Sequence, residues 1–114
     1  MDTTVRRSQY GDLFAETVVP LGADRRELRI DTRKGFRGLR TSATVVQVSE
    51  DGRSFTHAMG LGTGLGDFSR TLRQQDPKVR ATEKAIRSLH ADALTEIDAT
   101  LAAARAHYAA KVPA

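Results

Sequence analysis

The first half of the chain contains segments that are rich in β-branched and aromatic residues, and one in which apolar and polar residues alternate, and these segments predict β-strands. Residues 13–19 are rich in β-branched and aromatic side chains and end before a proline. Over residues 27–33, Leu28, Ile30 and Thr32 fall on one side of an extended chain, with charged residues on the other. A period of two is typical of a strand with one buried face.

Two further strands are predicted in the middle of the chain. Residues 39–49 are rich in threonine and valine and predict one strand. Residues 54–59, which follow an Asp-Gly pair, predict a second strand that runs back alongside the first. The glycine of such a pair supplies the positive φ that a tight hairpin needs. Gly35 and Gly38 are placed to turn the preceding hairpin. Together the four segments predict an antiparallel meander.

Helices are predicted for the second half of the chain. A short helix is expected from Phe68 to Gln75. Asp76 and Pro77 then favour a second helix, since Asp caps a helix and Pro loses no needed hydrogen bond at the first helical position. From there to about Ala110 no Gly or Pro intervenes, and apolar residues recur mainly every three or four positions, as in one continuous helix. The predicted fold is therefore α+β: a four-stranded antiparallel β-meander, a short helix and one long C-terminal helix (ββββα).

The length of the chain indicates its domain organisation. A chain of 114 residues fits one domain, which we expect over residues 12–114 after a flexible arm at 1–11. The long helix would measure about 50 Å, whereas a strand of eight residues spans only about 27 Å. Residues 98–112 are therefore expected to overhang the sheet.

The overhanging part of the helix carries an apolar stripe. An exposed stripe of this kind favours self-association, and a second copy of the chain is the simplest partner. The alternative is that this end frays or folds back onto the arm. The residues expected at the dimer interface are Ile97, Leu101, Ala104 and Tyr108.

Positive charge is concentrated in one short segment. The chain has a net charge of +4, while residues 25–40 contain seven basic and two acidic residues, a net +5. The rest of the chain holds eleven basic and twelve acidic residues, a net −1. Such a concentration is typical of a surface that binds polyanions. The alternative is a solvated face on which Glu27 and Asp31 balance the arginines.

Residues 34–40 (KGFRGLR) combine an aromatic side chain with cations on a glycine hairpin. This combination favours nucleic acid, because Phe36 could stack on a base while the cations contact phosphates. The alternative is that Phe36 folds inward and closes the edge of the sheet. A smaller basic group lies near the start of the predicted long helix. The candidate nucleic-acid-binding residues are Arg29, Arg33, Lys34, Phe36, Arg37, Arg40, Lys84 and Arg87.

The predicted order of four strands and one helix resembles that of the Pur-type repeats and of the transcriptional-coactivator single-strand-binding domains. This resemblance lies in the order of the elements. It implies a dimer that lays a single strand across a basic, curved sheet.

The sequence offers little for catalysis or metal binding. The absence of Cys excludes thiol catalysis and Cys-ligated zinc. His57, His90 and His107 show no metal-binding spacing, and no serine belongs to a nucleophile motif. The glycine-rich run at 60–66 matches neither a dinucleotide nor a phosphate-loop pattern and indicates a flexible crossover. We therefore expect no catalytic residues, no metal and no cofactor.

No stretch approaches the roughly 18 apolar residues of a membrane span, and the first residues lack the apolar core of a signal peptide. We expect a cytoplasmic protein with no membrane partner. The sequence predicts a small, dimeric, non-enzymatic nucleic-acid-binding protein that favours single strands. The alternative is a protein-binding inhibitor or adaptor, of a phage or plasmid type, that acts through the sheet face or the C-terminal helix.

Overall fold

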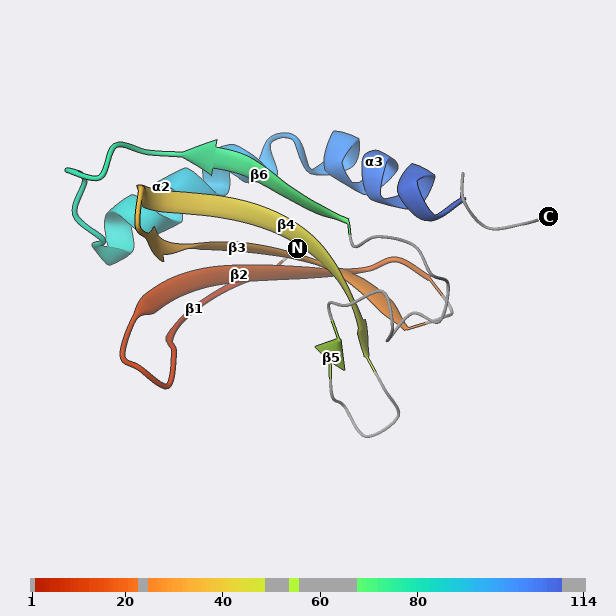
Figure 1. Ribbon diagram of the computed structural model, residues 1–114, viewed down its shortest axis with the longest axis horizontal. Helices are drawn as coiled ribbons and strands as arrows, with labels where there is room; N and C mark the ends of the chain where they lie inside the picture. Colours follow the sequence, from red (N-terminus) through yellow and green to blue (C-terminus); the bar gives the residue numbers. More distant parts are fainter. Residues whose placement is uncertain (1, 23–24, 49–53, 56–67, 110–114) are drawn as a thin grey trace.

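The computed structural model describes residues 2–22, 25–48, 54–55 and 68–109 (Figure 1). It confirms the α+β class and the antiparallel sheet. Two helices, α2 (Glu83–Leu94) and α3 (Ile97–Ala109), follow the last strand. Within the described residues the strands are β1 (Thr3–Arg7), β2 (Leu13–Pro20), β3 (Arg26–Gly35), β4 (Gly38–Val48), β5 (Ser54–Phe55) and β6 (Ser69–Gln74).

The strands form one sheet in the order β1-β2-β3-β4, and both β5 and β6 pair with β4. Residues 40–44 of β4 pair with β6, while Gln47 and Val48 at its end pair with β5. The predicted meander corresponds to β2 through β5. Residues 56–59 of its fourth strand and the glycine-rich run lie outside the described residues.

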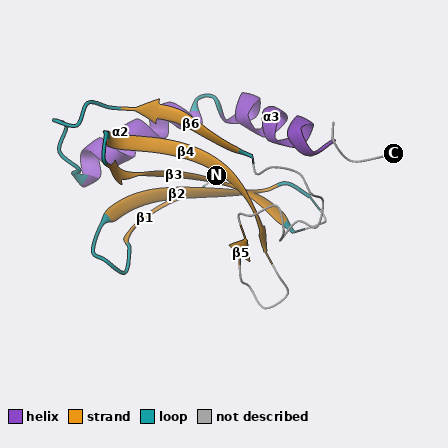
Figure 2. Ribbon diagram, in the orientation of Figure 1, coloured by secondary structure: helices purple, strands orange, loops and turns teal. Residues whose placement is uncertain are grey.

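Both helices lie against one side of the sheet, and no described helix covers the other side, which we call the open face (Figures 1 and 2). Alternate residues of the central strands face the helices, which is the period-two pattern that the sequence predicts for β3. Leu28 and Ile30 of β3 are fully buried, as are Ala43 and Val45 of β4. A second cluster, under α2, contains Ala15, Leu39, Ile86 and Leu89.

The N-terminal segment is part of the sheet, where the sequence analysis expects a flexible arm over residues 1–11. Strand β1 pairs with β2 along its whole length. The hydroxyl oxygens of Thr3 and Thr17 are 2.9 Å apart, and Val5 packs against the second cluster. These contacts hold β1 against the sheet.

The prediction of a short helix from Phe68 to Gln75 is wrong, because this segment forms β6. The backbone groups on the free side of β4 need hydrogen-bond partners, and β6 supplies them. Leu72 packs against the core cluster around Leu28 and Ile30. Tertiary pairing therefore overrides the local helical tendency.

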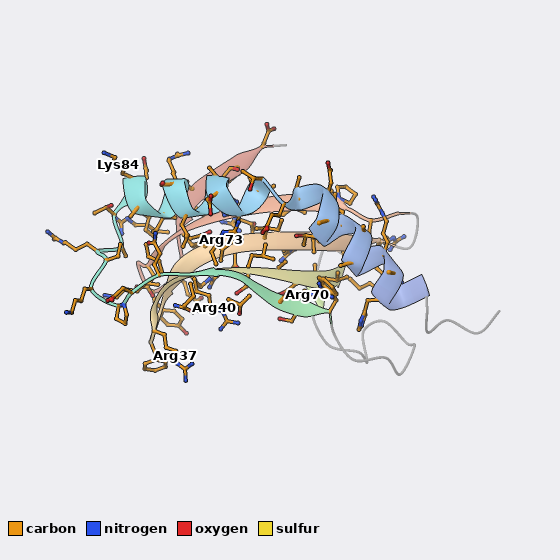
Figure 3. All side chains as sticks on the ribbon, turned by 90° about the horizontal axis from the view of Figure 1, so that it is seen from above. Arg37, Arg40, Arg70, Arg73 and Lys84 are labelled. Carbon is orange, nitrogen blue, oxygen red and sulfur yellow. The ribbon has the colours of Figure 1, made fainter. Side chains whose placement is uncertain are left out.

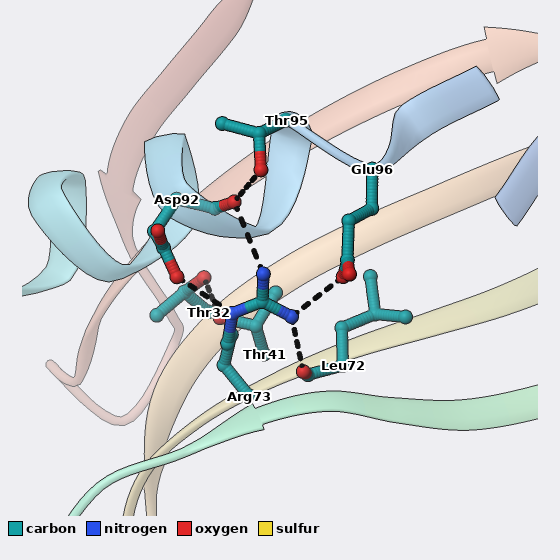
Figure 4. Close-up of polar contacts among 7 residues, drawn as sticks. All are labelled: Thr32, Thr41, Leu72, Arg73, Asp92, Thr95 and Glu96. Carbon is teal, nitrogen blue, oxygen red and sulfur yellow. Dashed lines mark hydrogen bonds and ion pairs between the residues drawn. The ribbon is translucent and has the colours of Figure 1, made fainter. Parts of the chain in front are cut away.

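The prediction of one continuous helix from Asp76 is also wrong. Helix α2 begins after Thr82, whose Oγ1 accepts a hydrogen bond from the backbone N of Ala85 (3.1 Å). Asp76 instead accepts from the backbone N of Lys78 (2.8 Å), which makes a turn. The break between α2 and α3 is stabilised at Thr95, whose Oγ1 donates to the carbonyl of Asp92 (2.6 Å; Figure 4).

Because the helix breaks, α3 packs onto the sheet, and one face of the described part of the segment expected to overhang is covered. Ala104 is fully buried, and Ile97 and Leu101 are half-buried against the cluster that contains Leu28. The apolar stripe that the sequence assigns to a dimer interface thus contacts the core of its own chain. The side chain of Tyr108 lies outside the described residues.

Candidate nucleic-acid interface

The open face of the sheet carries a row of side chains that crosses five strands. The register places Arg6, Phe14, Arg33, Arg40 and Gln74 directly opposite one another on neighbouring strands. Opposite residues of antiparallel strands project to the same side of the sheet. We call these five residues the open-face row. Arg6 and Phe14 were missed by the sequence analysis, since only strand pairing brings them beside Arg33.

Two arginines enclose the aromatic ring of the open-face row. The guanidinium carbons of Arg6 and Arg33 lie 5.1 and 4.9 Å from the centre of the Phe14 ring, which is within cation–π range. Arg6 also pairs with Glu16 (3.1 Å), and Arg33 pairs with Asp31 (2.6 Å). Both guanidinium groups are therefore held in place, and each has a carboxylate beside it.

Arg29, Arg33 and Arg40 all lie on the open face, but they differ in whether a nearby carboxylate already balances their charge. Arg29 lies 3.6 Å from Glu27, and Arg33 is paired with Asp31 on the same strand. The alternative in which Glu27 and Asp31 balance the basic segment therefore describes these two arginines well. Arg40 has no such partner within the described residues.

The β3–β4 hairpin carries the basic residues of this segment that have no carboxylate partner among the described residues. Phe36 and Arg37 form its turn, and Phe36 is fully exposed, with a relative accessibility of 107%. The alternative in which Phe36 folds inward is therefore wrong. Lys34 and Arg40 flank the turn and are exposed. Within the described part of the chain, Lys34, Arg37 and Arg40 form no ion pair.

The hairpin turn is clamped against the end of β6. Nε2 of Gln74 donates to the carbonyl oxygens of Arg37 (2.8 Å) and Leu39 (3.2 Å). Gly38 has a φ of +99°, and a Cβ at this position would come within 2.4 Å of the carbonyl oxygen of Gln75. Only glycine fits such a position, so Phe36 is presented on a turn of fixed geometry.

Lys84 and Arg87 are not brought together with the open-face row. Both lie on α2, which covers the opposite side of the sheet, and Figure 3 shows Lys84 well away from Arg37 and Arg40. Arg87 pairs with Glu83 one turn earlier (3.3 Å). The structure therefore separates the predicted basic residues into a hairpin group and a helix group.

His90 is buried on the helix side and is engaged through both ring nitrogens. Its Nε2 lies 2.7 Å from Oγ1 of Thr17, and its Nδ1 lies 2.8 Å from Oγ1 of Thr32. Burial lowers the pKa of His90, and the charge of Asp31 opposes this shift. With 1% of its surface exposed, the ring has a structural role in α2 packing.

Among the described residues, no group of His, Asp or Glu side chains could hold a metal ion, and no helix is long and apolar enough to cross a membrane. Comparisons with protein-family models, with curated proteins and with solved structures found no match.

Proposed function

We propose that the protein binds nucleic acid, with a preference for single strands, through the β3–β4 hairpin. The observation that carries this proposal is a group of hairpin cations that form no ion pair among the described residues, Lys34, Arg37 and Arg40, beside a turn that exposes the ring of Phe36 fully. Phosphates are bound by cations that are free to neutralise them. Arg29 is not part of the proposed surface, because Glu27 already balances it.

The exposed aromatic ring favours nucleic acid over other polyanions. Cations alone suffice to bind a phosphate-rich surface, whereas bases also stack on aromatic side chains. Bases within a duplex stack on each other, so an aromatic ring gains more from the unpaired bases of a single strand. We assign the protein no catalytic role. We further propose that it acts in the cytoplasm.

The test is fluorescence anisotropy of labelled single-stranded and duplex DNA and RNA, titrated with the protein at several salt concentrations. We expect single strands to bind more tightly than duplexes. Three phosphate contacts predict a slope of log K against log salt of about −2. No binding of the wild-type protein at the lowest salt concentration would overturn the proposal.

A pair of charge-matched variants tests the location of the site. The Arg37/Arg40→Gln double variant removes two cations from the hairpin, and we expect the salt slope to become shallower by about 1.4. The Arg70/Arg105→Gln variant removes the same charge elsewhere, and Figure 3 shows Arg70 far from Arg37. We expect this control to keep the wild-type slope. Equal slopes for both variants would place the site elsewhere.

The alternative function is a protein-binding inhibitor or adaptor that acts through the sheet face or the C-terminal helix, and its second form has less support. Ile97, Leu101 and Ala104 contact the core of the chain itself, so these residues are already occupied by packing.

A further inference from the structure

A pocket of about 320 Å³, lined mainly by charged and hydroxyl-bearing residues, lies on the open face over β3, β4 and the start of β6. Arg33 and Arg40, which are directly opposite each other in the strand register, form two of its walls. Lys34 stands at the end nearest the hairpin turn. The remaining hydrogen-bonding groups of the pocket come from Asp31, Ser42, Thr44 and Ser69.

The two arginine walls differ in chemistry. Arg33 is held between the Phe14 ring at 4.9 Å and the Asp31 carboxylate at 2.6 Å, and about half of its side chain stays exposed. Because Asp31 balances its charge, Arg33 attracts a phosphate weakly, but its planar guanidinium still stacks on a base. Arg40 and Lys34 have no ion pair within the described residues, so their charge is available to phosphate.

We propose that this pocket holds one nucleotide of a bound single strand, with the base stacked on Arg33 and the adjacent phosphate contacted by Arg40. This inference rests on the proposed function and specifies a second binding position, next to the exposed ring of Phe36. The preordered guanidinium of Arg33 lowers the entropy cost of stacking, since its position is fixed before the strand arrives.

The carboxylate in the pocket gives the site a base preference. An ionised carboxylate has several acceptor positions and no donor, so Asp31 retains acceptor capacity while it pairs with Arg33. It therefore favours bases that carry an amino group, such as cytosine. Thymine has no amino group and therefore cannot donate such a hydrogen bond to the Asp31 carboxylate. We expect oligo-dC to bind more tightly than oligo-dT of the same length.

The test compares oligo-dC with an abasic strand that has the same number of phosphates. Arg33→Lys keeps the positive charge beside Asp31 but removes the planar group. We expect its affinity for oligo-dC to fall about tenfold, which is within the usual range for loss of one stacking contact. Its affinity for the abasic strand and its salt slope should stay at the wild-type values, because no phosphate contact changes.

Arg29→Lys is the matched control. Arg29 lies on the same strand and the same face, forms an ion pair with a carboxylate two residues earlier as Arg33 does, and does not line the pocket. We expect this variant to bind both strands like the wild-type protein. Thermal unfolding of the two variants shows whether either substitution disturbs the fold.

Three results would overturn the nucleotide pocket: wild-type affinity of Arg33→Lys for oligo-dC, an equal loss of affinity for both strands, or an equal loss in the Arg29→Lys control. In each case the wild-type protein still binds, so the hairpin proposal stands. If the wild-type protein binds neither strand, the proposed function itself fails.

Discussion

His90 connects α2 to the central strands through hydroxyl groups. Its ring nitrogens contact Thr17 and Thr32, and Oγ1 of Thr32 lies 2.7 Å from Oγ1 of Thr41. A neutral imidazole has one donor and one acceptor, which this pair of hydroxyls can satisfy. A buried imidazolium would lack the solvation that its charge requires. The network therefore favours the neutral ring.

We predict that stability falls as the pH drops below the unfolded-state pKa of histidine, about 6.5. Burial lowers the pKa of His90 in the folded state, so the unfolded chain binds more protons below that pH, and the stability present above it is lost. The loss is at most about 1.4 kcal/mol per pH unit. Urea unfolding at several values between pH 7.5 and 5.5 measures it.

The variant His90→Gln provides the control for this pH dependence. We expect it to be less stable than the wild-type protein at neutral pH, and to lose less stability on acidification over the same range. An equally steep loss in the variant would assign the pH dependence to other groups.

Single residues were predictable where a sequence pattern fixes their environment. The alternation along β3 places Thr32 on the apolar side, and the basic hairpin identifies Arg37 and Arg40. No pattern in the sequence distinguishes Phe14 or Arg6 from their neighbours. Their role depends on the pairing register, which links residues far apart in the sequence.

At the scale of secondary-structure elements, Arg73 ties β6 to the end of α2 and to the turn that follows it (Figure 4). Its Nε lies 2.6 Å from the Asp92 carboxylate, its Nη1 lies 2.7 Å from that of Glu96, and the same Nη1 donates to the carbonyl of Leu72 (2.7 Å). The hydrogen bond with Asp92, and to a smaller extent the one with Glu96, raises the pKa of Arg73. One side chain therefore joins the edge strand to the break between α2 and α3.

We predict that Arg73→Gln loosens β6 more than the centre of the sheet. The amides of β6 should exchange with solvent several-fold faster than in the wild-type protein, while those between β2 and β3 stay protected, because the inner strands do not depend on this ion pair. Hydrogen exchange resolved by residue measures the difference. Arg70→Gln, on the same strand, should show a smaller effect, since Arg70 forms no ion pair within the described residues.

The elements that the sequence predicts well are those with an internal pattern. Alternation identifies β3, a composition rich in β-branched residues identifies β2 and β4, and the Gly pair locates the hairpin between β3 and β4. The pattern fails for β6, whose conformation depends on the free edge of β4. It also fails at the end of α2, which carries neither Gly nor Pro. There the Thr95 side chain and the ion pairs of Arg73 stabilise the break between the helices.

At the scale of the whole molecule, the sheet has one covered side and one open side. The helix side holds the two core clusters, including the α3 residues Ile97, Leu101 and Ala104 that the sequence predicts at a dimer interface. The open side and the hairpin hold the candidate site. Because α3 packs against the sheet, its apolar residues no longer require a second copy of the chain to cover them. A dimer through α3 stays a prediction that the packing of a single chain does not require.

We predict that unfolding of the wild-type protein does not depend on protein concentration. If α3 packed on a second chain, mass action would raise the melting temperature with concentration. Because Leu101 packs on the core of its own chain, the melting temperature should stay constant over about a hundredfold range. Leu101→Ala should lower the free energy of unfolding by about 1.5 kcal/mol, below the usual cost for a fully buried leucine, and equally at every concentration. A concentration-dependent melting temperature that this substitution abolishes would instead assign α3 to a dimer interface.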